Sequence, residues 1–165
     1  LPESQQVFLL ARPLAAISVG LHPVEKLTPR EVEVLLASAC RNVSPGYGSG
    51  LTSEDFLVDQ AKRIHKALPR RVRKSVEAIA GRYVEAPRLD FPRWSAAIGR
   101  VCQAVAALLS DDLVACVEVM QRSERELTGL SGDALVRSSS TVRDLMRFWV
   151  SDAGIKLRKQ IGMLD

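Results

Sequence analysis

Apolar residues recur at every third or fourth position through most of this 165-residue chain, which is the spacing of one face of an α-helix. The pattern starts near Thr28 and breaks where glycine, proline and polar residues cluster, as in SPGYGSG at 44–50. It predicts about seven helices. Their expected ranges are 28–43, 52–68, 69–83, 90–108, 110–120, 131–149 and 151–162.

The first 20 residues have a different pattern. Two short apolar runs, VFLL at 7–10 and AAISVG at 15–20, are separated by ARPL. Short apolar runs between breaking residues are typical of strands. We therefore expect a mainly α fold, a compact multi-helix domain, with a short β-hairpin or edge strand at its N-terminal side.

Several helix starts carry their own local signals. Thr28 and Glu31 have the spacing of a capping box, with Pro29 at the first helical position. Thr52 and Asp90 each precede an apolar stripe and can cap the helices that follow, and Ser151 can begin the last helix.

Composition indicates what kind of core the protein has and whether it could cross a membrane. Hydrophobic residues make up 47% of the chain but aromatic residues only 5%, so aliphatic side chains must fill the core. No apolar run reaches the length of about 20 residues that a membrane span needs.

We expect one domain covering residues 1–165, the C-terminal fragment of a longer chain. Three cysteines without a paired spacing favour buried thiols in the cytoplasm.

Positive charge is concentrated in one part of the chain. Residues 61–93 contain ten lysine or arginine residues and three acidic ones, whereas the formal net charge of the whole chain is +4. The densest cluster, Arg70, Arg71, Arg73 and Lys74, begins a helix after Pro69. It is either the solvated face of that helix or a surface for an acidic partner. No aromatic residue lies among these charges to stack on bases.

One resemblance points to DNA. LTPREVEVL, residues 27–35, resembles the first helix of a quorum-sensing-type helix-turn-helix, and VDQAKRIHKAL, residues 58–68, resembles its recognition helix. The resemblance implies a transcription regulator, which stays the alternative function. Between the two segments stands SPGYGSG, whose proline and three glycines oppose the short scaffold helix that this motif requires.

A second resemblance points to a protease scaffold. The segment AAISVGLHPVEKLTPREVEVLLASACRNV is similar to the edge strand and zinc helix of zincin metalloproteases related to the CAAX prenyl endopeptidases. At the positions that match the zinc ligands and general base of that family stand Ser38, Ala39, Asn42 and Ser95. Serine and asparagine are poor zinc donors, and alanine cannot act as a base. The isolated His22 and His65 match no ligand spacing, so we expect no metal and no proteolysis.

A third resemblance covers the later part of the chain. A pattern in the C-terminal regions of large tetratricopeptide-repeat proteins of myxobacteria is matched by Trp94, Arg100, Asp112-Leu113, Asp144-Leu145, Phe148, Ser151 and Leu157-Arg158. The two scaffold resemblances together imply a non-catalytic, zincin-like interaction domain of a bacterial repeat protein.

The expected function is therefore protein interaction without catalysis. The expected partner is another protein or the upstream repeat region of the same chain. It would add to the edge strand AAISV at Ile17 and contact Arg70, Arg71, Arg73 and Lys74. We expect no cofactor, no metal, no small-molecule substrate and no membrane partner, and favour a protein partner over nucleic acid.

Overall fold

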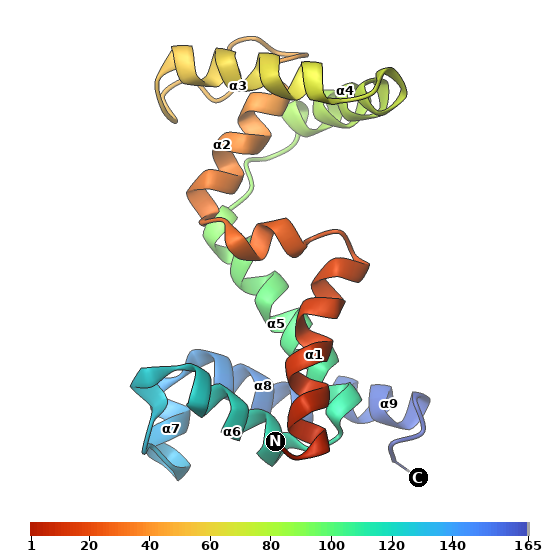
Figure 1. Cartoon of the computed structure of the whole chain (residues 1–165), viewed down its shortest axis with the longest axis vertical. Coiled ribbons are helices and arrows are strands. Elements are labelled where there is room, and N and C mark those ends of the chain that lie inside the picture. Colours follow the sequence, from red (N-terminus) through yellow and green to blue (C-terminus); the bar gives the residue numbers. More distant parts are fainter. Residues whose placement is uncertain (165) are drawn as a thin grey trace. The chain divides into compact units, whose positions relative to one another are not determined.

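The computed structural model describes residues 1–164, apart from the side chain of Glu25. Within that range the chain forms nine α-helices, two short 3-10 helices and no strand, so the mainly α fold is confirmed (Figure 1). The α-helices are α1 (Glu3–Ser18), α2 (Pro29–Cys40), α3 (Glu54–Ala67), α4 (Arg70–Glu85), α5 (Phe91–Ser110), α6 (Leu113–Ser123), α7 (Gly132–Ser138), α8 (Ser140–Val150) and α9 (Asp152–Gln160). The 3-10 helices are η1 (His22–Lys26) and η2 (Arg125–Leu127). No helix in the described range is both long and apolar enough to cross a membrane.

The helices gather into two compact units. Unit 1 combines Leu1–Glu25 with the described residues from Ala96 onward, and unit 2 is the continuous segment Lys26–Ser95. Unit 1 therefore contains α1, most of α5 and α6–α9, whereas unit 2 contains α2, α3, α4 and the start of α5. The expectation of a single domain over residues 1–165 stays a prediction.

The predicted β-hairpin is wrong, because the apolar runs at 7–10 and 15–20 belong almost entirely to α1. Gln5, Phe8 and Ala11 follow one another at helical spacing and are buried. Pro13 lies inside the helix, where its ring nitrogen cannot donate to the backbone. α1 nevertheless continues to Ser18 and packs against α6.

Polar side chains fix how α1 lies on α6. Ser4 Oγ donates to Asp112 Oδ2 over 3.2 Å, and the buried amide of Gln5 donates to Glu118 Oε2 over 2.6 Å. Arg122 in turn donates to Gln5 Oε1 over 3.0 Å. Because a buried amide without partners is costly, these bonds favour one register of α1 over its neighbours.

The principal hydrophobic core lies in unit 1. Phe8 and Ala11 of α1 meet residues from α5, α6, η2, α7 and α8 there. Those residues are Ala106, Ala107, Cys116, Val119, Met120, Leu127, Leu135, Val142 and Leu145. Aliphatic and small residues dominate this cluster, as the low aromatic content predicts.

The helix predicted over 131–149 is interrupted at Ser139, which accounts for one of the additional helices. Ser139 has an extended backbone, and its hydroxyl accepts a hydrogen bond from Val142 N over 3.2 Å, so it caps α8 instead of continuing α7. Serine side chains compete with the helix backbone in this way. The other additional helix is α1.

In unit 2, side-chain hydrogen bonds between residues three apart define where α2, α3 and α5 begin. The capping box at Thr28 and Glu31 is confirmed, with Thr28 N donating to Glu31 Oε2 over 2.7 Å. These bonds hold the pKa of Glu31 below its ordinary value. Asp90 accepts from Arg93 N over 3.0 Å, as expected. Ser53, not Thr52, caps α3 by accepting from Phe56 N.

Candidate protein-interaction surface

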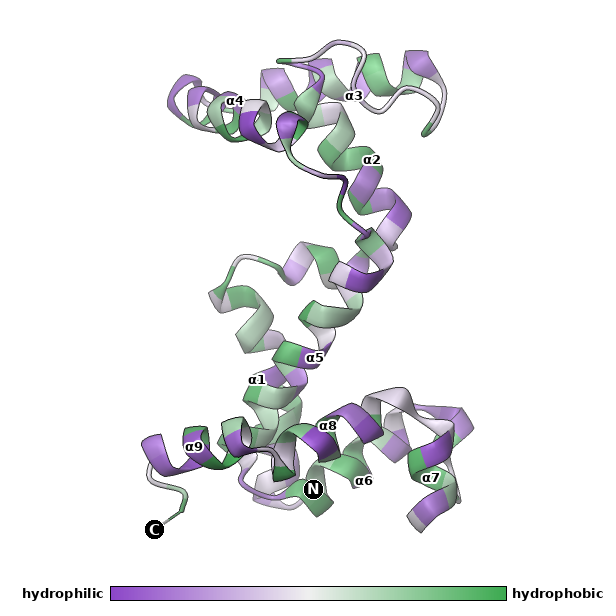
Figure 2. Ribbon diagram, turned by 180° about the vertical axis from the view of Figure 1, so that it is seen from behind, coloured by the Kyte–Doolittle hydropathy of each residue, from purple (hydrophilic) through white to green (hydrophobic). Residues whose placement is uncertain are grey.

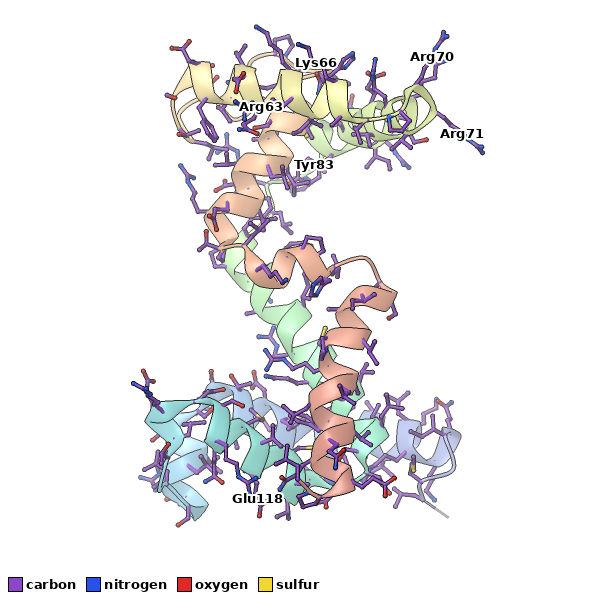
Figure 3. The ribbon with its side chains drawn as sticks, viewed as in Figure 1. Arg63, Lys66, Arg70, Arg71, Tyr83 and Glu118 are labelled. Atoms are coloured by element: carbon purple, nitrogen blue, oxygen red, sulfur yellow. The ribbon has the colours of Figure 1, made fainter. Side chains whose placement is uncertain are left out.

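Seven basic residues gather where α3 turns into α4, and we call this group the basic hairpin. It comprises Lys62, Arg63, Lys66, Arg70, Arg71, Arg73 and Lys74. Pro69 directs the turn, because it forces Leu68 into an extended conformation and precedes the first residue of α4. Arg70 and Arg71 extend from this end of unit 2 in Figure 3, and the turn carries strongly hydrophilic colour in Figure 2.

The helical period places these charges outward. Leu57 and Ala61 are the buried residues of α3, whereas Lys62, Arg63 and Lys66 lie on its exposed side. Arg70, Arg71 and Lys74 are exposed in the same way at the start of α4. The helices therefore bury their small and aliphatic residues and present the cationic side chains to solvent.

Little negative charge offsets the basic hairpin. Residues 62–74 contain no acidic residue. Arg63 pairs with Asp59 over 2.8 Å, and His65 Nδ1 lies 4.0 Å from Glu77 on α4. No ion pair within residues 1–164 involves Lys62, Lys66, Arg70, Arg71 or Lys74. Like charges held this closely create a positive local field.

Arg73 differs from the other members of the predicted cluster. It is only partly exposed, and its guanidinium donates to the backbone oxygen of Leu68, at the end of α3, over 3.1 Å. A cation at a helix C-terminus satisfies a free carbonyl and complements the helix dipole. Arg73 therefore helps to build the turn, whereas Arg70, Arg71 and Lys74 are available to a partner.

A buried arginine organises the loop before α3, and sequence analysis did not find it. Arg41 is 7% exposed, and it donates to the backbone oxygen of Tyr47 over 2.9 Å and to Ser49 Oγ over 3.1 Å. It also pairs with Glu54 over 2.7 Å. Hydrogen bonds from Arg41 and from Ser49 hold the pKa of Glu54 below its ordinary value. These contacts connect the end of α2, the loop 41–53 and the start of α3.

A second feature that sequence analysis missed is an open groove between α2 and α3, with a volume of about 420 Å³. Leu35 and Phe56 line it and are 47% and 46% exposed. Both residues belong to apolar stripes, so periodicity alone places them in the core. On α4, likewise, Val72 and Ile79 are exposed while Ala80 is buried.

Ile17, the predicted edge-strand contact, lies in α1 of unit 1. Its side chain is exposed, but its backbone belongs to a helix and offers no strand edge for a partner. The predicted addition of a partner strand at AAISV is therefore wrong. The basic residues that were expected to act with Ile17 belong to unit 2.

Ser38 and Asn42, which stand at positions that match the zinc ligands of a protease, each bond to nearby backbone. Ser38 is fully buried and donates to the backbone oxygen of Val34 over 2.7 Å. Asn42 donates to the backbone oxygen of Ala39 over 3.3 Å. Ser95 lies in α5, and the described range contains no group of three His, Cys, Asp or Glu residues arranged to hold a metal ion.

The thiols are buried as expected. Cys40, Cys102 and Cys116 all lie in the interior. Burial raises the pKa of Cys40 above its ordinary value and raises the pKa of Cys116 to about 11. A thiol with such a raised pKa is protonated and weakly nucleophilic at neutral pH.

No protein-family model matches this chain, and neither a curated protein nor a solved structure matches it.

Proposed function

We propose that the chain is a non-catalytic protein-interaction domain that binds an acidic segment of a partner protein through its basic hairpin. The observation that carries this proposal is the outward, largely unneutralised charge of Lys62, Lys66, Arg70, Arg71 and Lys74. Arranged charge of this kind accelerates encounter with an acidic partner and selects against basic ones.

The resemblance of the later helices to tetratricopeptide-repeat proteins suggests where the acidic segment comes from. It would belong to a separate protein or to a repeat region that precedes this domain in the cytoplasm. The surroundings of Ser38, Ala39 and Asn42 support a role without proteolysis, because their side chains are engaged with neighbouring backbone or carry no functional group.

Transcription regulation is the competing function. In a helix-turn-helix the two helices are joined by a turn of about three or four residues. Here α2 ends at Cys40 and α3 begins at Glu54, and the intervening loop is held by Arg41. That connection disfavours major-groove reading by α3, although Arg63 and Lys66 are exposed on it (Figure 3).

The test compares an acidic peptide of about 15 residues with duplex DNA, each titrated against the full chain at about 50 and 150 mM salt. The proposal expects the peptide to bind, and changing Lys62, Lys66, Arg70 and Arg71 to Glu to weaken its binding about tenfold or more. Fluorescence anisotropy of the labelled probe measures both.

The matched control changes Arg125, Arg147, Lys156 and Lys159 to Glu. These exposed residues of unit 1 give the same net charge as the hairpin variant. Equal weakening by both variants would mean that only total charge matters and would refute the hairpin site. Sequence-selective binding of DNA at about 150 mM salt would favour the alternative function.

A further inference from the structure

We propose that unit 1 pairs with a second copy of this chain through an exposed apolar face formed by α1 and α5. This face, the α1–α5 face, comprises Leu10, Leu14 and Ile17 of α1 and Val101, Val105 and Leu109 of α5. The inference concerns unit 1 and does not depend on the acidic partner proposed for unit 2.

The face consists of two apolar rows at helical spacing. Leu10, Leu14 and Ile17 are separated by four and three residues, so they lie along one side of α1. Val101, Val105 and Leu109 repeat every four residues along α5. Apart from Val105, each of these side chains is more than half exposed. Both helices show hydrophobic colour along this part of unit 1 in Figure 2.

The α5 row is a ridge between two grooves. The first groove lies between α1 and α5, has a volume of about 520 Å³, and is lined by Leu10, Leu14, Val105 and Leu109 among others. The second has a volume of about 410 Å³ and lies between α5, α8 and α9, where Val101 and Val105 also line it. Val105 belongs to both grooves, so the apolar surface is continuous.

A ridge beside a groove can complement its own copy. In a two-fold dimer, the ridge of each copy can enter the groove of the other, and every contact then occurs twice. Helices commonly pack by this interdigitation of ridges and grooves. The α1–α5 face therefore has the shape that an isologous pair of helices requires.

Charge also favours a second copy as the occupant. None of the residues that line the first groove, all within the described range, is charged. In the second groove Arg100 and Asp144 lie 3.9 Å apart and offset one another. Such a face has no net charge with which to select an acidic or basic partner, and two copies of it meet without net repulsion.

The area is adequate for association. The exposed side chains of the face present apolar surface on the order of 300 Å². That is at the lower end of the range for the largest apolar patch of a typical monomer, about 300–600 Å². A standard interface covers about 800 Å² on each partner, of which roughly 60% is apolar. The face supplies more than half of that apolar part before its rim is counted.

Sedimentation equilibrium of the full chain tests the proposal. We expect the mass to approach twice that of the 18.1-kDa chain as concentration rises, with a Kd of about 10 µM or tighter. Leu14→Glu and Val101→Glu should each weaken the dimer about thirtyfold or more, because symmetry places two carboxylates in one apolar interface. The dimer should not weaken as salt rises, unlike binding at the basic hairpin.

Val114→Glu is the matched control, because Val114 is an exposed valine of unit 1 on α6 and lines neither groove. A monomer at about 1 mM would overturn the proposal. A dimer that survives both face variants, or one that Val114→Glu weakens equally, would also overturn it. Circular dichroism checks that each variant keeps its helix content. If the Glu variants unfold, Leu14→Gln and Val101→Gln replace them, and the dimer is judged by the same criteria.

Discussion

At the scale of single residues, the loop between α2 and α3 depends on one glycine. Gly48 has a φ of +75°, and a Cβ atom added there would lie 2.6 Å from the Cβ of Ala37, a buried residue of α2. Gly50 has a φ of +85° but open space around it, and Gly46 has open space without a positive φ. Alanine substitutions at these three glycines therefore distinguish the cost of a strained backbone from the cost of steric overlap.

We expect Gly48→Ala to destabilise the protein most, because it combines a left-handed backbone, costing about 1–2 kcal/mol, with overpacking of about 1–3 kcal/mol. Gly50→Ala should cost about 1–2 kcal/mol from the backbone alone. Gly46→Ala should be neutral or slightly stabilising. Urea unfolding monitored by circular dichroism measures all three, and any other order would show that this loop is not held as described.

At the scale of elements, Arg41 determines how the loop 41–53 connects α2 to α3. We expect Arg41→Met to lower the free energy of unfolding by about 1–3 kcal/mol, because Tyr47 O, Ser49 Oγ and Glu54 lose a largely buried donor. Urea midpoints compare it with Arg63→Met, whose exposed ion pair with Asp59 should contribute little.

The same contact predicts a dependence on pH. The pKa of Glu54 is lower in the folded protein than its ordinary value of 4.5, chiefly through its hydrogen bond from Arg41. Folding is therefore favoured while Glu54 is ionised, above its unfolded pKa, and this contribution disappears as pH falls through the lowered folded value. Glu54→Gln should be less stable than the wild type near neutral pH, and the difference should vanish in acid. A difference that stays constant with pH would contradict this assignment.

Elements specified by neighbouring residues could be predicted from sequence. The bonds between Thr28 and Glu31 involve residues three apart, so the start of α2 is visible in the sequence itself. The basic hairpin is equally local, because all its charges lie within residues 62–74. The separate role of Arg73 was not visible, since it depends on the carbonyl of Leu68 across a turn.

The prediction failed for α1 because that helix is apolar on two sides. Phe8 and Ala11 face the core, while Leu10 and Leu14 are exposed, so the three-to-four periodicity is lost. Pro13 then resembles a break between strands. Leu35 and Phe56 pose the opposite difficulty: their spacing is that of core residues, and only the packing of α2 and α3 shows that they are exposed.

At the scale of the whole molecule, the two units differ in how much they bury. The eleven-residue core cluster lies in unit 1, and unit 2 spans only residues 26–95. Small units bury proportionally less surface and are less stable. Each unit contains one tryptophan: Trp94 in unit 2 and Trp149 in unit 1.

Single-tryptophan variants should therefore report different stabilities. We expect the Trp149→Phe variant, which keeps Trp94, to show a fluorescence midpoint at least about 0.5 M lower in urea than the Trp94→Phe variant. Circular dichroism of both variants controls for destabilisation by the substitutions themselves. Coincident midpoints would mean that the two units unfold together, and would instead support the single domain expected from the sequence.

The pairing of α1 with α6 has a consequence for synthesis on the ribosome. Ser4 and Asp112 are 108 positions apart, and Gln5 and Glu118 are 113 apart. At about 5–20 residues per second, the nascent chain carries α1 for roughly 5–20 s before α6 exists to cover it. All of unit 2 is translated in that interval and can fold first. Phe8 and its neighbours meanwhile form an exposed apolar segment, the kind that chaperones bind during translation.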